Sequence, residues 1–348
     1  MKLRIPHFLR RVAPVPSGYR AQAALAAVLV AIAGGSGGNL LVHELGKLPA
    51  GAVFQAGNTV VTEDQLDHRV TVMRFLYGVQ QPTDPAGLDQ FKRSVAKAVA
   101  VSGVVDDAAR AAGIVIADKA ASDQLDKLVS DNGTDRRTFI QQLGASGVSE
   151  QDVLDEIKRQ QAGARLFGQV TAPVKAATDA DAQRYYDQNR AQMVSPEQRE
   201  LANIVVSSPD QAQLVAQQAR SGADFGALAA QYSIDGSTKG KGGALGTVTA
   251  GQLDPGYAKA AFSAPAGSVF GPVQTQNGWN VGRIGAVHPG SPMTFDQVKD
   301  AIKTKLDNDG KLKVWDDFLV AKIKAANIEY APAYQPADPD APPAAAGA

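Results

Sequence analysis

The side chains that most often carry enzyme chemistry are scarce in this sequence. The 348-residue chain has no cysteine, which excludes disulfides, zinc–thiolate sites and thiol nucleophiles. Its only histidines are His7, His43, His68 and His288. A Gly-x-Ser-x-Gly pattern at 34–38 lies in an apolar segment with no strand before it, so it is not a hydrolase nucleophile elbow. We therefore expect neither a metal nor a cofactor.

The charges of the chain are balanced. It has 35 Lys and Arg residues and 35 Asp and Glu residues, so its formal net charge is zero. Association with a polyanion needs an excess of positive charge. We therefore expect no nucleic-acid partner.

The segment from Glu200 to Val287 carries the densest structural signals. The apolar, β-branched run Leu201 to Val206 predicts a strand, and Ser208-Pro209-Asp210 after it is typical of a helix start. A second helix fits Phe225 to Tyr232. The glycine-rich, polar stretch from Asp235 to Gly243 predicts a loop.

The rest of this segment predicts a short strand, a helical turn and a hairpin that complete a small α+β domain. Leu245 to Val248 reads as a short strand and Gly256 to Phe262 as a helical turn. Two apolar runs, Val269 to Thr275 and Trp279 to Val287, are separated by Gln276-Asn277-Gly278. Asn-Gly between such runs is a strong hairpin signal. The predicted fold is a small antiparallel sheet with surrounding helices.

Several motifs occur in this segment in a fixed order. They are Gly-Ala-Asp-Phe from Gly222, Tyr232-Ser233, Gly-Gly-x-Leu-Gly from Gly242, Ala261-Phe262, and Gly-Pro-Val-x-Thr between Gly267 and Gly278. Their order and spacing resemble the parvulin family of peptidyl-prolyl cis/trans isomerases over about ninety residues. The resemblance implies a parvulin-type isomerase domain at 195–288.

The resemblance also implies two groups of site residues. An apolar shelf for the proline ring falls on Leu253, Tyr257 and Phe262, although Phe262 could equally be core. Tyr257 stands where the family usually has Phe, so its added hydroxyl needs water or a partner.

A polar cluster falls on Asp235, Thr275, Asn203 and Asn280, of which the last two replace the histidines of the family. Two neighbouring amides can hydrogen-bond reciprocally without titrating. The Asn pair could keep part of the isomerase activity, or the activity could depend on the missing histidines.

The N-terminus reads as an export segment. Residues 1–20 are basic without an acid, which predicts a cytoplasmic tail, and residues 21–42 carry no charge. The uncharged stretch is long enough for a single-pass anchor, with the bulk of the chain outside the cytoplasm. Alternatively, cleavage after Ala33 would release a secreted product.

The region 51–192 is predicted to be mainly helical. Val53 to Val61 reads as a hairpin or turn, followed by a helix capped at Thr62, and another helix opens at Ser149. This pattern resembles the SurA/PrsA-type chaperone region. The helix with Tyr185-Tyr186 resembles the link from that region to the isomerase domain.

The C-terminal part predicts one long amphipathic helix at 293–326, whose apolar face needs a partner. By resemblance it packs on the N-terminal helices, so that the isomerase domain is an insertion. Residues 331–348, rich in Pro and Ala, are expected to form a disordered tail.

Two functions fit these features. The first is a foldase outside the cytoplasm that binds unfolded proteins and Pro-containing peptides and isomerises X-Pro bonds. The alternative is a holdase chaperone whose parvulin-like domain binds peptide without catalysis. Asn203 and Asn280 are the residues that separate the two.

Overall fold

The computed structural model describes residues 48–343, and the chain divides into two compact units. The inserted unit spans Thr178–Lys303, and the terminal unit combines residues 48–177 with residues 304–343. The α+β class is confirmed. The predicted segments 1–20 and 21–42, with the cleavage point at Ala33, lie outside the described residues. Within residues 48–343, no helix combines the length and the apolar character needed to cross a bilayer.

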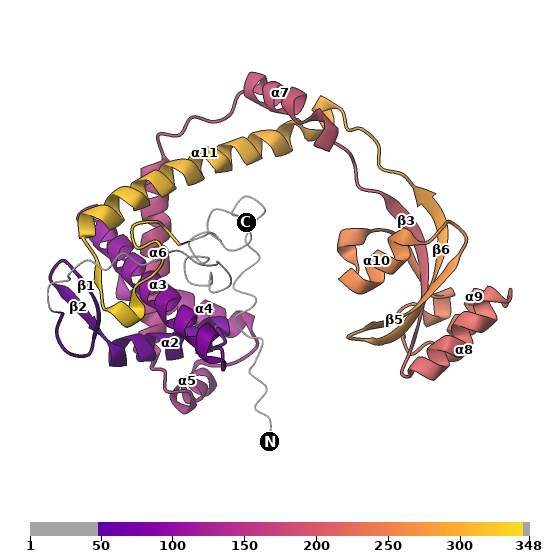
Figure 1. The fold of residues 1–348 in the computed structure, drawn as a ribbon, viewed down its shortest axis with the longest axis horizontal. Helices are drawn as coiled ribbons and strands as arrows, with labels where there is room; N and C mark the ends of the chain where they lie inside the picture. The colour runs from indigo at the N-terminus through magenta and orange to yellow at the C-terminus, as the bar shows by residue number, and fades with distance from the viewer. Residues whose placement is uncertain (1–47, 344–348) are drawn as a thin grey trace. The chain divides into compact units, whose positions relative to one another are not determined.

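The inserted unit is built on a four-stranded antiparallel sheet (Figure 1). The strands, in spatial order, are β4 (Ala244–Thr249), β3 (Gln198–Val206), β6 (Gly278–His288) and β5 (Val269–Thr275). Helices α8 (Pro209–Arg220) and α9 (Phe225–Tyr232) lie on one face, and α10 (Pro255–Ser263) lies on the other. These elements confirm the strands and helices predicted for this segment.

Alternation along β3 gives the sheet two different faces. Ile204 and Val206 point to one face, where they pack with Phe225 and other apolar residues of α8 and α9. Leu201 points to the opposite face, where it packs with Tyr257 of α10. Because successive side chains of a strand point to opposite faces, Asn203 shares the α10 face with Leu201.

The β5–β6 hairpin closes where the sequence predicts it. Thr275 pairs with Gly278 across the turn. Gly278 has a φ of 125°, and a Cβ there would lie 2.7 Å from the carbonyl oxygen of Val206. Only glycine combines this backbone conformation with so close an approach of two strands.

The inserted unit extends beyond the predicted 195–288 at both ends. Helix α7 (Asp179–Gln188) begins at a capping box on Thr178, and the carboxylate of Asp179 pairs with Lys299 and Lys303 at the start of α11 (Phe295–Ala326). The Tyr186 hydroxyl donates to the carbonyl oxygen of Met293 at 2.8 Å. These contacts join the two chain segments that flank the sheet.

The terminal unit is mainly helical. Its helices are α2 (Glu63–Tyr77), α3 (Pro85–Ala111), α4 (Asp118–Asp131), α5 (Arg136–Ala145), α6 (Glu150–Thr171) and the later part of α11. The hairpin of β1 (Ala52–Ala56) and β2 (Thr59–Thr62) precedes them. Capping boxes at Thr62 and Ser149 open α2 and α6, as predicted.

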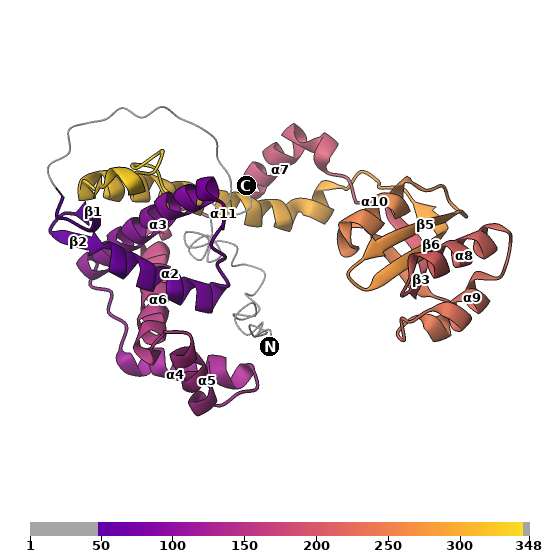
Figure 2. The ribbon, with the colours of Figure 1, turned by 60° about the horizontal axis from the view of Figure 1, so that its bottom comes forward.

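The later part of α11 packs against N-terminal helices of the terminal unit (Figure 2). Trp315, Leu319 and Ile323 are buried in one cluster with residues of α3 and α6. The rings of Trp315 and Phe167 meet edge to face, with centroids 5.4 Å apart. The predicted long helix therefore finds its apolar partner within this unit.

The prediction of a disordered tail from residue 331 is wrong for its first part. Strand β7 (Glu329–Tyr330) pairs with β1, and Tyr330 and Tyr334 are buried in the adjoining core. The guanidinium of Arg93 donates to the carbonyl oxygens of Pro332 and Gln335 at 3.1 and 2.8 Å. Two large tyrosines and an arginine clamp hold a segment whose composition alone predicts disorder.

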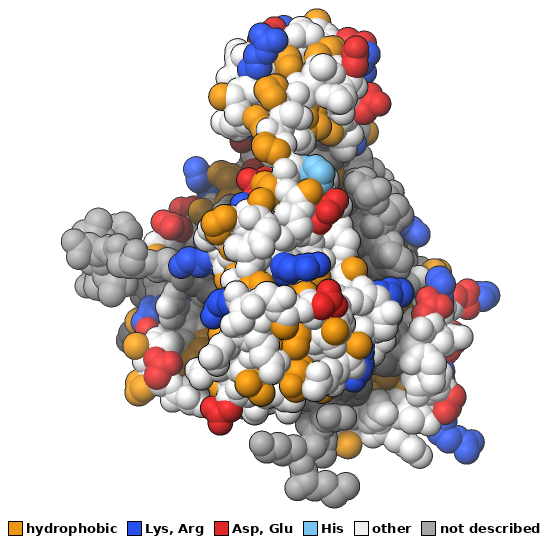
Figure 3. Space-filling model, turned by 90° about the vertical axis from the view of Figure 1, so that its right-hand side faces the viewer, with side chains coloured by type: hydrophobic (Ala, Val, Ile, Leu, Met, Phe, Trp, Pro, Cys, Tyr) orange, Lys and Arg blue, Asp and Glu red, His pale blue; other side chains and the backbone are white. Residues whose placement is uncertain are grey.

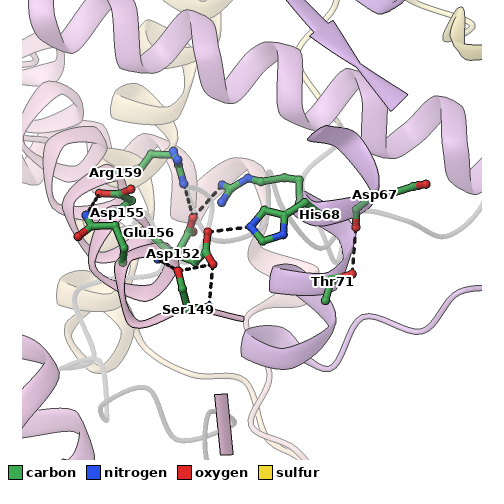
Figure 4. A network of polar contacts seen from close by, with 10 residues as sticks. Asp67, His68, Thr71, Ser149, Asp152, Asp155, Glu156 and Arg159 are labelled. Carbon is green, nitrogen blue, oxygen red and sulfur yellow. Dashed lines mark hydrogen bonds and ion pairs between the residues drawn. The ribbon is translucent and has the colours of Figure 1, made fainter. Parts of the chain in front are cut away.

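A buried polar network ties α2 to α6 (Figure 4). Glu156 is only 2% exposed, and its carboxylate accepts hydrogen bonds from Arg69 (2.8 Å), Arg159 (2.6 Å) and the Tyr77 hydroxyl (2.7 Å). Burial alone would raise the pKa of Glu156, but the two guanidinium groups reverse this effect and hold the pKa below its ordinary value. The carboxylate is therefore ionised and fully paired.

On the face of the molecule shown in Figure 3, Lys and Arg side chains are interspersed with those of Asp and Glu. This mixing matches the balanced composition.

Candidate functional site

The α10 face of the inserted sheet carries a row of neutral polar side chains. Asn203 on β3 and Asn280 on β6 are 7% and 4% exposed. Asn203 Nδ2 donates to Asn280 Oδ1 at 2.7 Å. Asn280 Nδ2 in turn donates to Thr275 Oγ1 on β5 at 2.9 Å. Three of the four predicted polar site residues thus form one hydrogen-bonded chain across three strands.

The direction of this chain is set by the surroundings of Asn280. Its Nδ2 faces three oxygen acceptors, which are Thr275 Oγ1, the carbonyl of Gly278 at 3.0 Å and the carbonyl of Val273 at 3.4 Å. A flipped amide would place its oxygen against both carbonyls. Oδ1 of Asn280 therefore faces Asn203 as an acceptor, and Asn203 donates to it with Nδ2.

The prediction that the two amides bond reciprocally is wrong. Only one hydrogen bond joins them, and Asn203 Oδ1 is buried with no partner among the described residues. The register explains this result, because Asn203 pairs with Gly282 while Asn280 pairs with Val205. The two amides are diagonal neighbours, so they meet end to end instead of side by side.

Asp235 stabilises the loop in which it lies. Among the described residues, no hydrogen bond connects it to the chain of Asn203, Asn280 and Thr275. Its carboxylate accepts from the backbone N–H of Ser237 (2.9 Å) and from the hydroxyls of Ser237 and Thr238 (both 2.6 Å). These hydrogen bonds lower the pKa of Asp235. The loop is fastened to β3, since Ile234 N–H donates to the carbonyl oxygen of Val205 at 2.8 Å.

The three predicted shelf residues meet in one apolar cluster, but they differ in burial. Tyr257 is 3% exposed, whereas Leu253 and Phe262 are half-buried at its margin. Arg199 lies over the Phe262 ring, with its guanidinium carbon 5.1 Å from the ring centroid. Tyr257 is thus the buried floor of the cluster, and Leu253 and Phe262 are the two predicted shelf residues that are partly exposed.

Sequence reasoning missed two half-buried members of the same cluster, Leu245 on β4 and Val273 on β5. The signal for each residue was its place inside a motif of the resemblance, Gly-Gly-x-Leu-Gly for Leu245 and Gly-Pro-Val-x-Thr for Val273. Neither was assigned to the shelf.

Tyr257 packs closely onto the sheet. Its ring centroid lies 5.1 Å from that of Phe270, and both rings approach Gly282 of β6. Burial raises the pKa of the Tyr257 hydroxyl. That hydroxyl, which was expected to need water or a partner, has no hydrogen-bond partner among the described residues.

The chain is similar to known isomerases and foldases. Residues 177–300 match the family model of the PPIC-type PPIase domain. The foldase protein PrsA of Clostridium botulinum (strain Okra) is 27% identical over 214 residues, which are 61% of this chain and 63% of that protein. The chain therefore spans slightly less than two thirds of that relative's length.

Two further comparisons cover more of the chain. The foldase protein PrsA of Caldanaerobacter subterraneus is 29% identical over 245 residues, which are 70% of this chain and 72% of that protein. A crystal structure of the peptidylprolyl isomerase PrsA from Bacillus anthracis has 23% identity, covers 67% of this chain and 97% of its own, and gives a TM-score of 0.33.

Three observations concern the same inserted unit: the order of its motifs, the apolar cluster on the α10 face of its sheet, and the match to the family model. Residues 177–300 thus match the PPIC-type, that is parvulin-type, peptidyl-prolyl isomerase domain, and the chain that carries them is similar to PrsA foldases.

Proposed function

We propose that this chain is a foldase that acts outside the cytoplasm, where it binds unfolded proteins and catalyses cis/trans isomerisation of their X-Pro bonds. The observation that carries the proposal is the PPIC-type domain at 177–300, in which an apolar cluster and a chain of neutral polar groups share one face of the sheet. Export rests on the basic and uncharged N-terminal segments, which would anchor the chain in the membrane or be cleaved after Ala33.

The reaction needs no covalent step. Rotation about a peptide bond has a barrier of about 18–20 kcal/mol because the nitrogen lone pair is shared with the carbonyl. The same sharing makes isomerisation of X-Pro bonds slow. An enzyme lowers the barrier by binding the twisted amide better than the planar one. Removing the bond from water favours the twisted form, because its nitrogen no longer shares charge with the carbonyl oxygen.

The apolar cluster supplies these conditions. Leu253 and Phe262 would grip the pyrrolidine ring above Tyr257, and the surrounding aliphatic side chains would exclude water from the amide. Unfolded segments offer such rings freely, whereas folded proteins bury many of them. We expect the terminal unit to bind the rest of an unfolded client.

The polar chain would orient the substrate without a proton transfer. Asn203, Asn280 and Thr275 are neutral at all physiological pH values, and Asp235 braces the adjacent loop as an ionised carboxylate. A bond that only rotates requires no acid or base. The alternative function, a holdase whose isomerase domain only binds peptide, would follow if the family's histidines are indispensable.

The neutral chain of Asn203, Asn280 and Thr275 predicts a flat pH dependence of the isomerisation rate. The isomerisation rate of the chain should change little between about pH 6 and 8, because the Asn pair does not titrate and the lowered pKa of Asp235 keeps it ionised throughout. Replacing both Asn203 and Asn280 by His should introduce a titration near the ordinary histidine pKa of ~6.5 and raise the rate. Either single replacement should gain less, because one imidazole lacks its partner.

The measurement is the rate constant of a Pro-containing peptide across this pH range, for the wild-type chain and the three variants. A wild-type profile that already titrates near pH 6.5 would show that another group controls the rate. A flat profile in the double His variant would show that these positions do not contribute to the rate.

A further inference from the structure

Two buried polar atoms of the isomerase site lack partners within residues 48–343. They are Asn203 Oδ1 and the Tyr257 hydroxyl oxygen. Residues Asn203 and Tyr257 are 7% and 3% exposed. A buried polar atom left unpaired typically costs about 1–3 kcal/mol. Two such atoms in one small site therefore call for a common explanation.

The two atoms have complementary chemistry. The surroundings of Asn280 fix the Asn203 amide so that its Nδ2 is used and its Oδ1 is left as an acceptor. The Tyr257 hydroxyl is both a donor and an acceptor, and its raised pKa keeps the proton in place. Asn203 needs a donor, and Tyr257 has one to give.

The backbone places the two groups next to each other. Gly282 is the direct cross-strand partner of Asn203. A Cβ at Gly282 would lie only 2.7 Å from the Tyr257 hydroxyl oxygen and 2.1 Å from Cζ of Phe270. Cβ positions of directly opposed residues are about 4.5–5.5 Å apart. The Tyr257 hydroxyl thus occupies the space above the strand position that faces Asn203.

We propose that one buried water molecule links the two groups by accepting a hydrogen bond from the Tyr257 hydroxyl and donating one to Asn203 Oδ1, because the two protein atoms do not bond to each other directly. This link completes a chain of neutral donors that runs from Tyr257 through Asn203 and Asn280 to Thr275. Tyr257 is then a positioning residue as well as the floor of the shelf, because its hydroxyl fixes the amide chain. The inference deepens the proposed isomerase function and rests on it.

Gly282 is part of the same arrangement. Any side chain at this position would collide with Phe270 and with the Tyr257 hydroxyl. The glycine therefore leaves room for the aromatic pair to reach the sheet beside Asn203.

The test uses the full chain with Tyr257→Phe, which removes one oxygen atom and keeps the ring. We expect kcat to fall about 2- to 12-fold, the effect of one hydrogen bond, with KM within about twofold because the shelf is intact. The matched control is Tyr330→Phe, which removes another buried tyrosine hydroxyl without a described partner, in the terminal unit. The control should leave kcat unchanged.

A double-mutant cycle with Asn203→Leu identifies the partner. Without the acceptor, Tyr257→Phe should have almost no further effect on kcat or on the unfolding midpoint of the inserted unit. Equal effects of Tyr257→Phe in both backgrounds would overturn the inference. If Tyr257→Phe and Asn203→Leu are coupled in the unfolding midpoint but the chain catalyses no isomerisation, the result would support the link and reject the proposed function instead.

NMR of the side-chain amides tests the link where Asn203→Leu does not fold. The Asn203 side-chain amide signals should shift in Tyr257→Phe and stay in place in Tyr330→Phe. Signals that are the same in the wild-type chain and in Tyr257→Phe would contradict the link.

Discussion

Glu156→Gln is expected to lower the free energy of unfolding of the terminal unit by about 3–5 kcal/mol. The substitution keeps the size of the side chain but removes the charge that compensates the partly buried guanidinium groups of Arg69 and Arg159. It also replaces one of the two acceptor oxygens by an NH2 group, so the side chain can no longer accept from both arginines and the Tyr77 hydroxyl in the native arrangement. Chemical denaturation followed by far-ultraviolet circular dichroism of the full chain measures the effect.

Glu150→Gln is the matched control, six residues earlier on α6. Glu150 pairs with Arg136, but the two side chains are 29% and 34% exposed. Partly exposed ion pairs are screened by solvent and are worth about 0–1 kcal/mol. A loss in Glu156→Gln no larger than that in Glu150→Gln would show that the network does not depend on the charge of Glu156.

The difference in the free energy of unfolding between wild type and Glu156→Gln should also decrease as the pH is lowered. The folded-state pKa of Glu156 lies below its unfolded value, so the stabilisation is complete above about pH 4.5 and is lost as pH falls through the folded pKa. Burial raises the pKa of Asp106 and acts in the opposite direction, and the charge of Glu156 adds only a smaller contribution to that rise, so most of the effect of Asp106 is common to both proteins. The difference between them should therefore shrink in acid.

Trp315→Ala is expected to destabilise the terminal unit by about 3–5 kcal/mol. Trp315 is 3% exposed and packs in one cluster with Phe167 of α6 and residues of α3 such as Val101. Its removal leaves a cavity between a C-terminal helix and helices encoded more than a hundred residues earlier. Proteolysis and the denaturation midpoint of the N-terminal helices should therefore both change.

Val314→Ala is the control on the same helix, because Val314 is 37% exposed and should cost little. If Trp315→Ala leaves the unfolding of the N-terminal helices unchanged, α11 does not belong to their folding unit.

Much of the fold could be read from local signals. The Asn-Gly turn, the capping residues Thr62 and Ser149, and the alternation in β3 each act within a few residues, so the sequence displays them directly. The tail could not be read in this way. Its order comes from Tyr330, Tyr334 and the Arg93 clamp, whose contacts lie more than two hundred residues apart in sequence.

The site shows the same division. The resemblance to parvulins pointed to Asn203, Asn280 and Thr275, but the direction of their hydrogen bonds depends on a diagonal register and on the carbonyls around Asn280. The unpaired Oδ1 of Asn203 follows from that direction. The Glu156 network escaped prediction because Arg69 and Tyr77 reach it from 87 and 79 residues away.

The central claim is that a parvulin-type site with an Asn pair isomerises prolyl bonds. Its most direct test is a protease-free assay at pH 7, in which NMR exchange spectroscopy measures the cis/trans interconversion of a Pro-containing peptide with and without the full chain. The account predicts a rate clearly above the uncatalysed one, which falls when Tyr257 loses its hydroxyl. An interconversion rate indistinguishable from that of the free peptide, together with intact suppression of client aggregation, would contradict it and leave a holdase.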